Sequence, residues 1–135
     1  MQETVHQPPV ALASSTLAGY KIRDHNGEEL GKVRDVVIDL EAGRVAYVAV
    51  QVGGFLGMND RLLAVPWEAL QVDAVNRQLM LNVEPETLQN QPTFQKDKWP
   101  GTTDDDRQPL KKVYEYYGFT PYWAEDGGDG ENQGE

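Results

Sequence analysis

The sequence of 135 residues contains no cysteine, which excludes disulfides, thiolate metal sites and cysteine nucleophiles. No run of it approaches the roughly 20 apolar residues that a membrane-spanning helix needs. The first residues have neither the basic start nor the apolar stretch of a secretory signal peptide. We therefore expect a protein without a membrane span that works in the cytoplasm.

Basic residues are scarce as well. The chain has 12 Lys and Arg against 22 Asp and Glu, so its formal net charge is −10. Residues 124–135 hold five of the carboxylates and no Lys or Arg, so half of the net charge lies in this tail. Nucleic acids and anionic membranes are bound through clustered Lys and Arg. Direct binding to either is therefore not expected.

Side chains that could perform acid–base or metal chemistry are few. The two histidines, His6 and His25, have no Ser or Asp placed as a triad partner and no zinc-ligand spacing. Turn hydrogen bonds and edge protection explain Asp35 and Asp39 more simply than catalysis does. The three aspartates at 104–106 lack a calcium-loop pattern and are interpreted as charge at the entry of a helix. The sequence thus predicts no enzyme, no cofactor and no metal.

Short strands separated by turn residues make up residues 17–84. Residues 45–52 are almost continuously apolar, which predicts a strand covered on both faces. Tight turns connect the strands, among them one at Asn26-Gly27, and no crossover helix fits between them. The pattern predicts a mainly β fold in which a small antiparallel sheet closes into a barrel.

One predicted strand, residues 30–40, changes the parity of its apolar positions. Val33 fits one phase, whereas Val36, Ile38 and Leu40 fit the other. Strict alternation would place the two sets on opposite faces of the sheet. We therefore expect a β-bulge between Val33 and Val36 that brings all four side chains to the same face.

The glycine-rich segment 53–60, GGFLGMND, connects two strands. It has no lysine and precedes a strand, so it does not fit a phosphate-binding loop. We interpret it as a sharp turn with Phe55 and Leu56 packed inward. The alternative is that Phe55, Leu56 and Met58 stay exposed at the tip of the loop and contact a partner protein.

Aromatic residues are concentrated near the C-terminus, where eight of the twelve lie between residues 94 and 123. Within this segment, apolar residues at 110, 113, 114 and 117 form one face of a short helix that Gly118 ends. So much aromatic area must be packed, and we predict a latch that wraps the outside of a barrel, either its own or that of a partner subunit. The candidate protein contacts in it are Trp99, Tyr114, Tyr117, Tyr122 and Trp123.

These observations divide the chain into four parts. Residues 1–16 are expected to be a flexible leader, and residues 17–84 form the barrel. Residues 85–123 form an irregular, aromatic-rich extension with the short helix. Residues 124–135 are rich in glycine and acid, which predicts a disordered tail.

Three motifs in the barrel segment occur together: G-K-V-x-D-x-V-I-D from residue 31, V-A-Y-x-x-V from residue 45 and A-V-P-W-x-A-L from residue 64. This combination resembles the PRC-barrel family. DKWP at 97–100 and YYG-x-x-PYW at 116–123 also look like a subgroup of stand-alone bacterial PRC-barrel proteins. The resemblance implies a small β-barrel that binds proteins, as in the H subunit of the photosynthetic reaction centre and in a ribosome maturation factor.

Three functions are compatible with the sequence and this resemblance. The first is a non-enzymatic protein-binding or assembly module that forms a homo-oligomer, with its partner open. The alternative is an accessory factor of ribosome maturation or RNA processing, which at this net charge would act through a basic ribosomal protein. A small-molecule binder that uses the barrel mouth ranks last, because side chains fill the interior of small barrels.

Overall fold

The structure is a computed structural model that describes residues 9–53, 61–94, 98–101 and 107–125. Phe55, Leu56 and Met58, the aspartates at 104–106 and residues 126–135 of the tail lie outside the described residues. In chain order the elements are α1 (Ser14–Leu17), β1 (Lys21–Arg23), β2 (Glu29–Asp39), β3 (Arg44–Val52), β4 (Arg61–Pro66), a 3-10 turn (Trp67–Ala69), β5 (Leu70–Asp73), β6 (Gln78–Leu81), α2 (Pro85–Asn90), α3 (Gln108–Tyr116) and α4 (Tyr122–Glu125).

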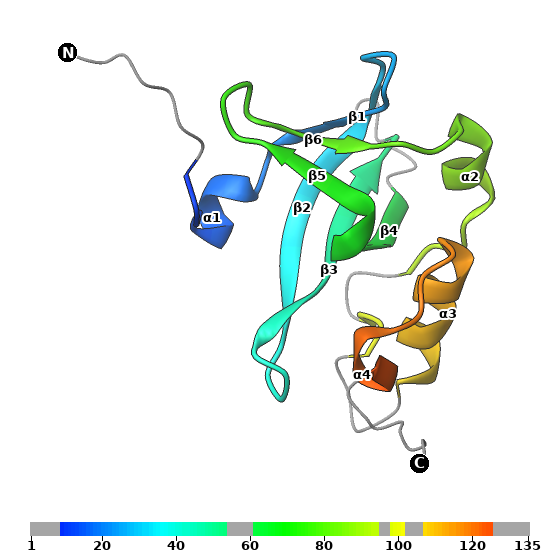
Figure 1. The fold of residues 1–135 in the computed structure, drawn as a ribbon. Coiled ribbons are helices and arrows are strands. Elements are labelled where there is room, and N and C mark those ends of the chain that lie inside the picture. The colour runs from blue at the N-terminus through cyan, green and yellow to red at the C-terminus, as the bar shows by residue number, and fades with distance from the viewer. Residues whose placement is uncertain (1–8, 54–60, 95–97, 102–106, 126–135) are drawn as a thin grey trace.

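Six strands form one curled sheet in the order β4-β3-β2-β1-β6-β5, with β5 and β6 lying across β2 and β3 (Figure 1). Neighbouring strands pair antiparallel as predicted, except that β1 and β6 are parallel. A short 3-10 turn, and not a hairpin, joins β4 to β5. These two strands point in the same direction within the sheet, and β6 is therefore parallel to β1. The predicted mainly β fold is confirmed as a curled half-barrel.

The turn between β1 and β2 is wider than predicted. Gly27 has a positive φ of 85°, but Asn26 does not, so this is not a two-residue hairpin turn. The buried carboxylate of Asp24 accepts hydrogen bonds from the N–H groups of Asn26 and Glu28, each at 2.9 Å. An aspartate that organises the backbone after it therefore sets the width of this turn.

β2 contains the predicted bulge. Its register with β3 shifts just after Val33, and Val33 and Val36 both contact the same hydrophobic cluster. The prediction that Ile38 and Leu40 join them is wrong, because these side chains are 48% and 91% exposed. A second register shift follows Val37, which packs on the other side of the sheet, and it carries the end of the strand away from the core.

Two hydrophobic clusters cover the two faces of β3, which confirms that this strand is buried on both sides. The inner cluster lies within the curl of the sheet and includes Ile22, Val48, Val50, Leu63, Leu79 and Leu81. The outer cluster consists of Ala46, Tyr47, Ala64, Leu110, Tyr114 and Tyr122. Half of its members come from the extension, so this segment covers the outer face of its own sheet.

α3 ends where the sequence predicts. Gly118 has a φ of 84°, its N–H donates to the carbonyl of Glu115, and the N–H of Phe119 donates to the carbonyl of Tyr114. This pair of hydrogen bonds is the Schellman motif, which favours glycine because of the positive φ. The chain can therefore turn back after α3, so that α4 lies beside it (Figure 1).

Candidate functional site

An anchor made of Asp39, Arg107 and Tyr122 attaches the end of the extension to the barrel. The hydroxyl of Tyr122 donates a hydrogen bond to the Asp39 carboxylate, and the Arg107 guanidinium donates another at 3.0 Å. Arg107 also reaches Glu41 at 3.1 Å. Asp39 further accepts from the N–H groups of the β2–β3 turn, so one carboxylate joins the turn to the extension.

The surroundings of Asp39 favour its charged form. Burial alone would raise the pKa of this carboxyl, but hydrogen bonds from Tyr122, the N–H of Ala42 and Arg107 outweigh burial and hold the pKa well below its usual range. Burial together with the Asp39 carboxylate raises the pKa of Tyr122 to about 12. The pair is thus a carboxylate and a neutral phenol over the whole physiological range of pH.

Aromatic rings pack around this anchor. Tyr114, Tyr122 and Trp123 lie with ring centroids 5.1 to 5.8 Å apart, in edge-to-face arrangements. The guanidinium of Arg44 lies 3.9 Å from the centre of the Tyr122 ring, and that of Arg107 lies 4.7 Å from the Trp123 ring. The hydroxyl of Tyr114 donates to the carbonyl of Ala46 on β3. These residues hold α3 and α4 against the sheet.

A second set of hydrogen bonds covers the outer edge of β4. The side-chain amide of the buried Gln91 donates to the carbonyl of Ala64 at 2.7 Å and accepts from the hydroxyl of Tyr117. The N–H of Phe94 donates to the carbonyl of Leu62 at 3.0 Å. Carbonyl groups that an added strand would use at this edge are therefore already occupied.

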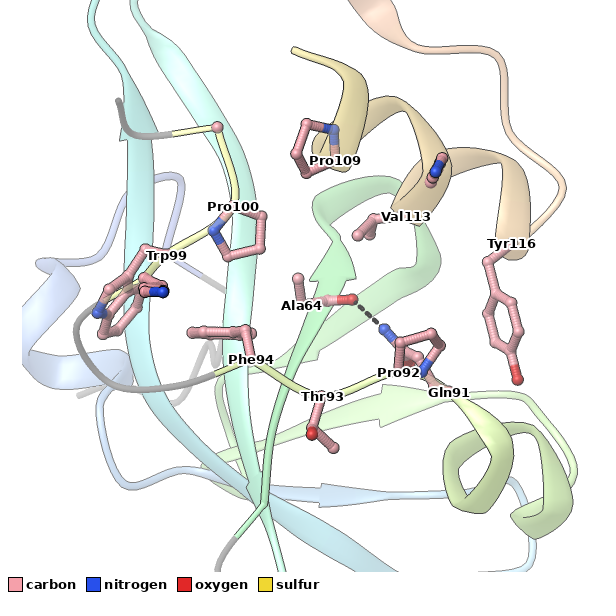
Figure 2. A pocket seen from close by; sticks show the side chains of 13 residues that line it. Ala64, Gln91, Pro92, Thr93, Phe94, Trp99, Pro100, Pro109, Val113 and Tyr116 are labelled. Atoms are coloured by element: carbon pink, nitrogen blue, oxygen red, sulfur yellow. Dashed lines mark hydrogen bonds between the residues drawn. The ribbon is translucent and has the colours of Figure 1, made fainter. Parts of the chain in front are cut away.

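Between this edge and α3 lies an open groove of about 710 Å³ (Figure 2). Phe94, Trp99 and Pro100 form one wall, with the Phe94 and Trp99 rings 5.3 Å apart. Side chains of α3 form the other wall, and Ala64 and Gln91 lie between the walls. The lining consists of Ala64, Gln91, Pro92, Thr93, Phe94, Lys98, Trp99, Pro100, Gly101, Pro109, Lys112, Val113 and Tyr116.

The charges in this groove have one sign. Among the described residues, Lys98 and Lys112 are the charged members of the lining, and none of the described carboxylates belongs to it. Both lysines are exposed. The groove is thus an apolar surface with a positive rim on a chain whose net charge is −10.

Candidate groups for chemistry do not come together in the part of the chain that the structure describes. Within it, no three His, Cys, Asp or Glu side chains are placed to hold a metal ion. His25 lines a separate hollow of about 340 Å³ with Glu68 and Tyr117. No helix among these residues is long and apolar enough to cross a membrane. That the protein is not an enzyme remains a prediction.

The residues of the extension that were predicted as protein contacts do not lie at one common surface. Trp99 lines the groove. Tyr114 and Tyr122 are buried in the outer cluster, and Trp123 and Tyr117 are half-buried against the outer and inner clusters. The structure thus brings Tyr114, Tyr122 and Trp123 together as supports of the extension.

Sequence reasoning missed most of the groove. Phe94, Lys98, Pro109, Lys112 and Val113 were not singled out as candidate contacts. The signal available in the sequence is the presence of two prolines and two aromatic residues within the nine residues 92–100, PTFQKDKWP. It does not reveal that α3 supplies the opposite wall, because that depends on how the chain folds back.

A comparison with models of protein families agrees with this fold. The family model of the PRC-barrel domain matches residues 9–88, more than half of the chain. Among solved structures, the chain is similar to the 16S ribosomal RNA processing protein RimM of Pseudomonas aeruginosa, with a TM-score of 0.40 and 15% sequence identity. The match covers 58% of this chain and 47% of that one. No curated protein sequence matches. The family match includes the three motifs, which the structure places in β2, in β3 and from the end of β4 to the start of β5, and it shows that the chain belongs to the PRC-barrel domain family.

Proposed function

We propose that the protein is a non-enzymatic binding module that docks an extended segment of another protein in the groove between the β4 edge and α3. The observation that carries this proposal is the open groove of about 710 Å³, lined largely by aromatic, proline and aliphatic side chains. Concave apolar surfaces of this size, with a few polar groups, are typical of binding sites. Aromatic-lined grooves are known to dock extended peptides.

The walls of the groove are held in place without a partner. The hydroxyl of Tyr114 joins α3 to β3, and the side-chain amide of Gln91 joins the segment 91–94 to β4. The Asp39 anchor attaches the end of the extension to the sheet. A preformed groove loses little conformational entropy when a peptide binds. The extension therefore supplies both the cover of the barrel and the two walls of the binding site, while Ala64 of β4 lies between them.

The inner space of the barrel supports a small-molecule site less well. The inner cluster contains fully buried side chains from strands on several sides of the curl, among them Ile22, Val48 and Leu79. These side chains occupy the interior in which a barrel-mouth ligand would lie. The groove lies on the opposite, outer side of the sheet, where Ala64 belongs to the outer cluster.

An accessory role in ribosome maturation or RNA processing, through a ribosomal protein, stays the alternative. The net charge of −10 suits a basic partner, but the two lysines of the groove do not. Such a partner would use another face of the molecule. Cosedimentation with ribosomal subunits tests this alternative directly.

Three further expectations from the sequence accompany the proposal. They are a homo-oligomeric state, a cytoplasmic location and the absence of direct nucleic-acid binding. The extension packs on its own sheet in this structure, so a homo-oligomer would use a surface other than the buried faces of Tyr114 and Tyr122.

Photo-crosslinking in cells tests the proposed docking site. A photoreactive amino acid replaces the exposed Thr93 in the groove, and a control chain carries it at the exposed Asn76, in the β5–β6 turn on the far side of the molecule (Figure 1). We expect a discrete protein adduct from position 93 and not from position 76. The same adducts from both positions, or none from position 93, would contradict the proposal.

A further inference from the structure

We infer that the segment bound in the groove is acidic as well as apolar, with a carboxylate side chain next to an aromatic or aliphatic one. This inference rests on the proposed function and names the chemistry of its partner. It follows from three observations: the sign of the charge at the groove, the occupied edge of β4, and the apolar character of the walls.

The charge that the described lining residues bring to the groove is opposite to the net charge of the molecule. Lys98 beside Trp99 and Lys112 on α3 belong to opposite walls of the groove, and both side chains are exposed. Neither forms an ion pair or hydrogen bond with the described residues, whereas the neighbouring Lys111 lies 4.0 Å from Glu115. Unpaired cations beside an apolar surface attract a carboxylate and exclude a basic segment.

Strand addition does not explain binding here. The carbonyls of Leu62 and Ala64 at the β4 edge already accept hydrogen bonds from Phe94 and Gln91. The groove is also lined by three prolines, which have no N–H to donate. A bound segment must therefore be recognised chiefly through its side chains, and the two lysines supply the charged donors for carboxylates.

A segment bound in the groove must also carry large apolar side chains. Phe94, Trp99 and Val113 offer apolar area that a purely acidic peptide would leave uncovered. The chain's own residues 126–135, DGGDGENQGE, are acidic but contain no aromatic or aliphatic side chain to fill this space. The occupant is therefore a partner segment in which acidic and large apolar residues lie close together.

The test begins with short random peptides displayed and selected on the full chain. We expect the selected sequences to combine Asp or Glu with Trp, Phe, Leu or Ile. The affinity of one selected peptide, measured by fluorescence anisotropy, should fall about fivefold in Lys112→Glu and less than about twofold in the matched control Lys111→Glu. Binding should also weaken as salt is added.

A plugged groove separates failure of this inference from failure of the proposed function. Thr93→Trp adds bulk at an exposed position of the lining. If Thr93→Trp abolishes binding but Lys112→Glu and Lys111→Glu act alike, the groove is the docking site and the inference about acidic partners is wrong. If Thr93→Trp leaves binding unchanged, or if no peptide is selected, both fail. A wild-type dimer that Thr93→Trp dissociates would place a second copy in the groove and would also overturn the inference.

Discussion

The hydroxyl of Tyr122 donates a hydrogen bond to the buried carboxylate of Asp39, across 83 residues of chain. This contact joins the last described helix to the turn between β2 and β3. The extension is thus part of the folded domain, and the same extension forms the groove with β4. Both the stability of the domain and the proposed binding site depend on this junction.

Removal of the Tyr122 hydroxyl should weaken this junction. A hydrogen bond to a charged group contributes about 1.5 to 3 kcal/mol, so Tyr122→Phe should lower the free energy of unfolding by this amount. Urea unfolding at neutral pH measures the change. The matched control is Tyr116→Phe, whose exposed hydroxyl donates to the carbonyl of Thr87; equal losses in the two variants would contradict a special role for the anchor.

Acid should release the same contact. The pKa of Asp39 in the folded protein lies below its ordinary value of 3.8, so the unfolded chain binds the proton more readily. The stabilisation is therefore complete above about pH 4 and is lost progressively as the pH falls below it.

Unfolding measured against pH checks this prediction. Asp39→Asn should be less stable than the wild type at pH 7, and the difference should shrink in acid. Asp35→Asn, a change at an exposed carboxylate on the same strand, should keep the acid dependence of the wild type. A constant difference between Asp39→Asn and the wild type over this range would show that the charge of Asp39 does not matter.

Gly31 marks a close approach between β2 and β3. A Cβ atom there would lie 2.6 Å from the carbonyl oxygen of Gln51 and 2.9 Å from a methyl of Val52. Gly31→Ala should therefore destabilise the fold by about 1 to 3 kcal/mol. The control is Gly43→Asn, in an open turn with a φ of 68° that asparagine tolerates. Thermal unfolding of the two variants should differ clearly, and an unchanged midpoint for Gly31→Ala would contradict the packing described.

Loss of the extension should expose the outer face of the sheet. A chain that ends at Asn90 leaves Ala46, Tyr47 and Ala64 uncovered and removes the cover of the β4 edge. Loss of one large buried aromatic side chain typically costs about 3 to 5 kcal/mol, so we expect severe destabilisation and self-association. Light scattering and thermal unfolding check this; a truncated chain that stays monomeric and equally stable would show that the extension is not needed.

Much of the barrel could be predicted from the sequence, because local patterns determine it. The change of parity between Val33 and Val36 predicts the bulge, and Gly118 predicts the end of α3. The same reasoning failed at Ile38, because the second register shift depends on how β2 meets β3 and leaves no mark in the alternation of residues. The parallel pairing of β1 with β6 likewise depends on the path of the chain between β4 and β5.

Fewer of the contacts in the candidate site could be predicted from the sequence. Trp99 was identified through its place in the aromatic-rich segment, but its partners in the groove come from α3 and the β4 edge. The pairing of Asp39 with Arg107 joins residues 68 positions apart, and neither residue type nor spacing indicates it. Such a site exists only after the extension has packed on the sheet.

The groove between the β4 edge and α3 is the proposed site at which this protein binds its partner. Amide NMR spectra of the full chain, titrated with a selected peptide, test it most directly. We expect the largest chemical-shift changes at groove residues such as Thr93, Trp99 and Val113, and we expect these changes to vanish in Thr93→Trp. Shifts centred on the exposed β5 strand or on the β2–β3 turn, with the groove unaffected, would contradict it.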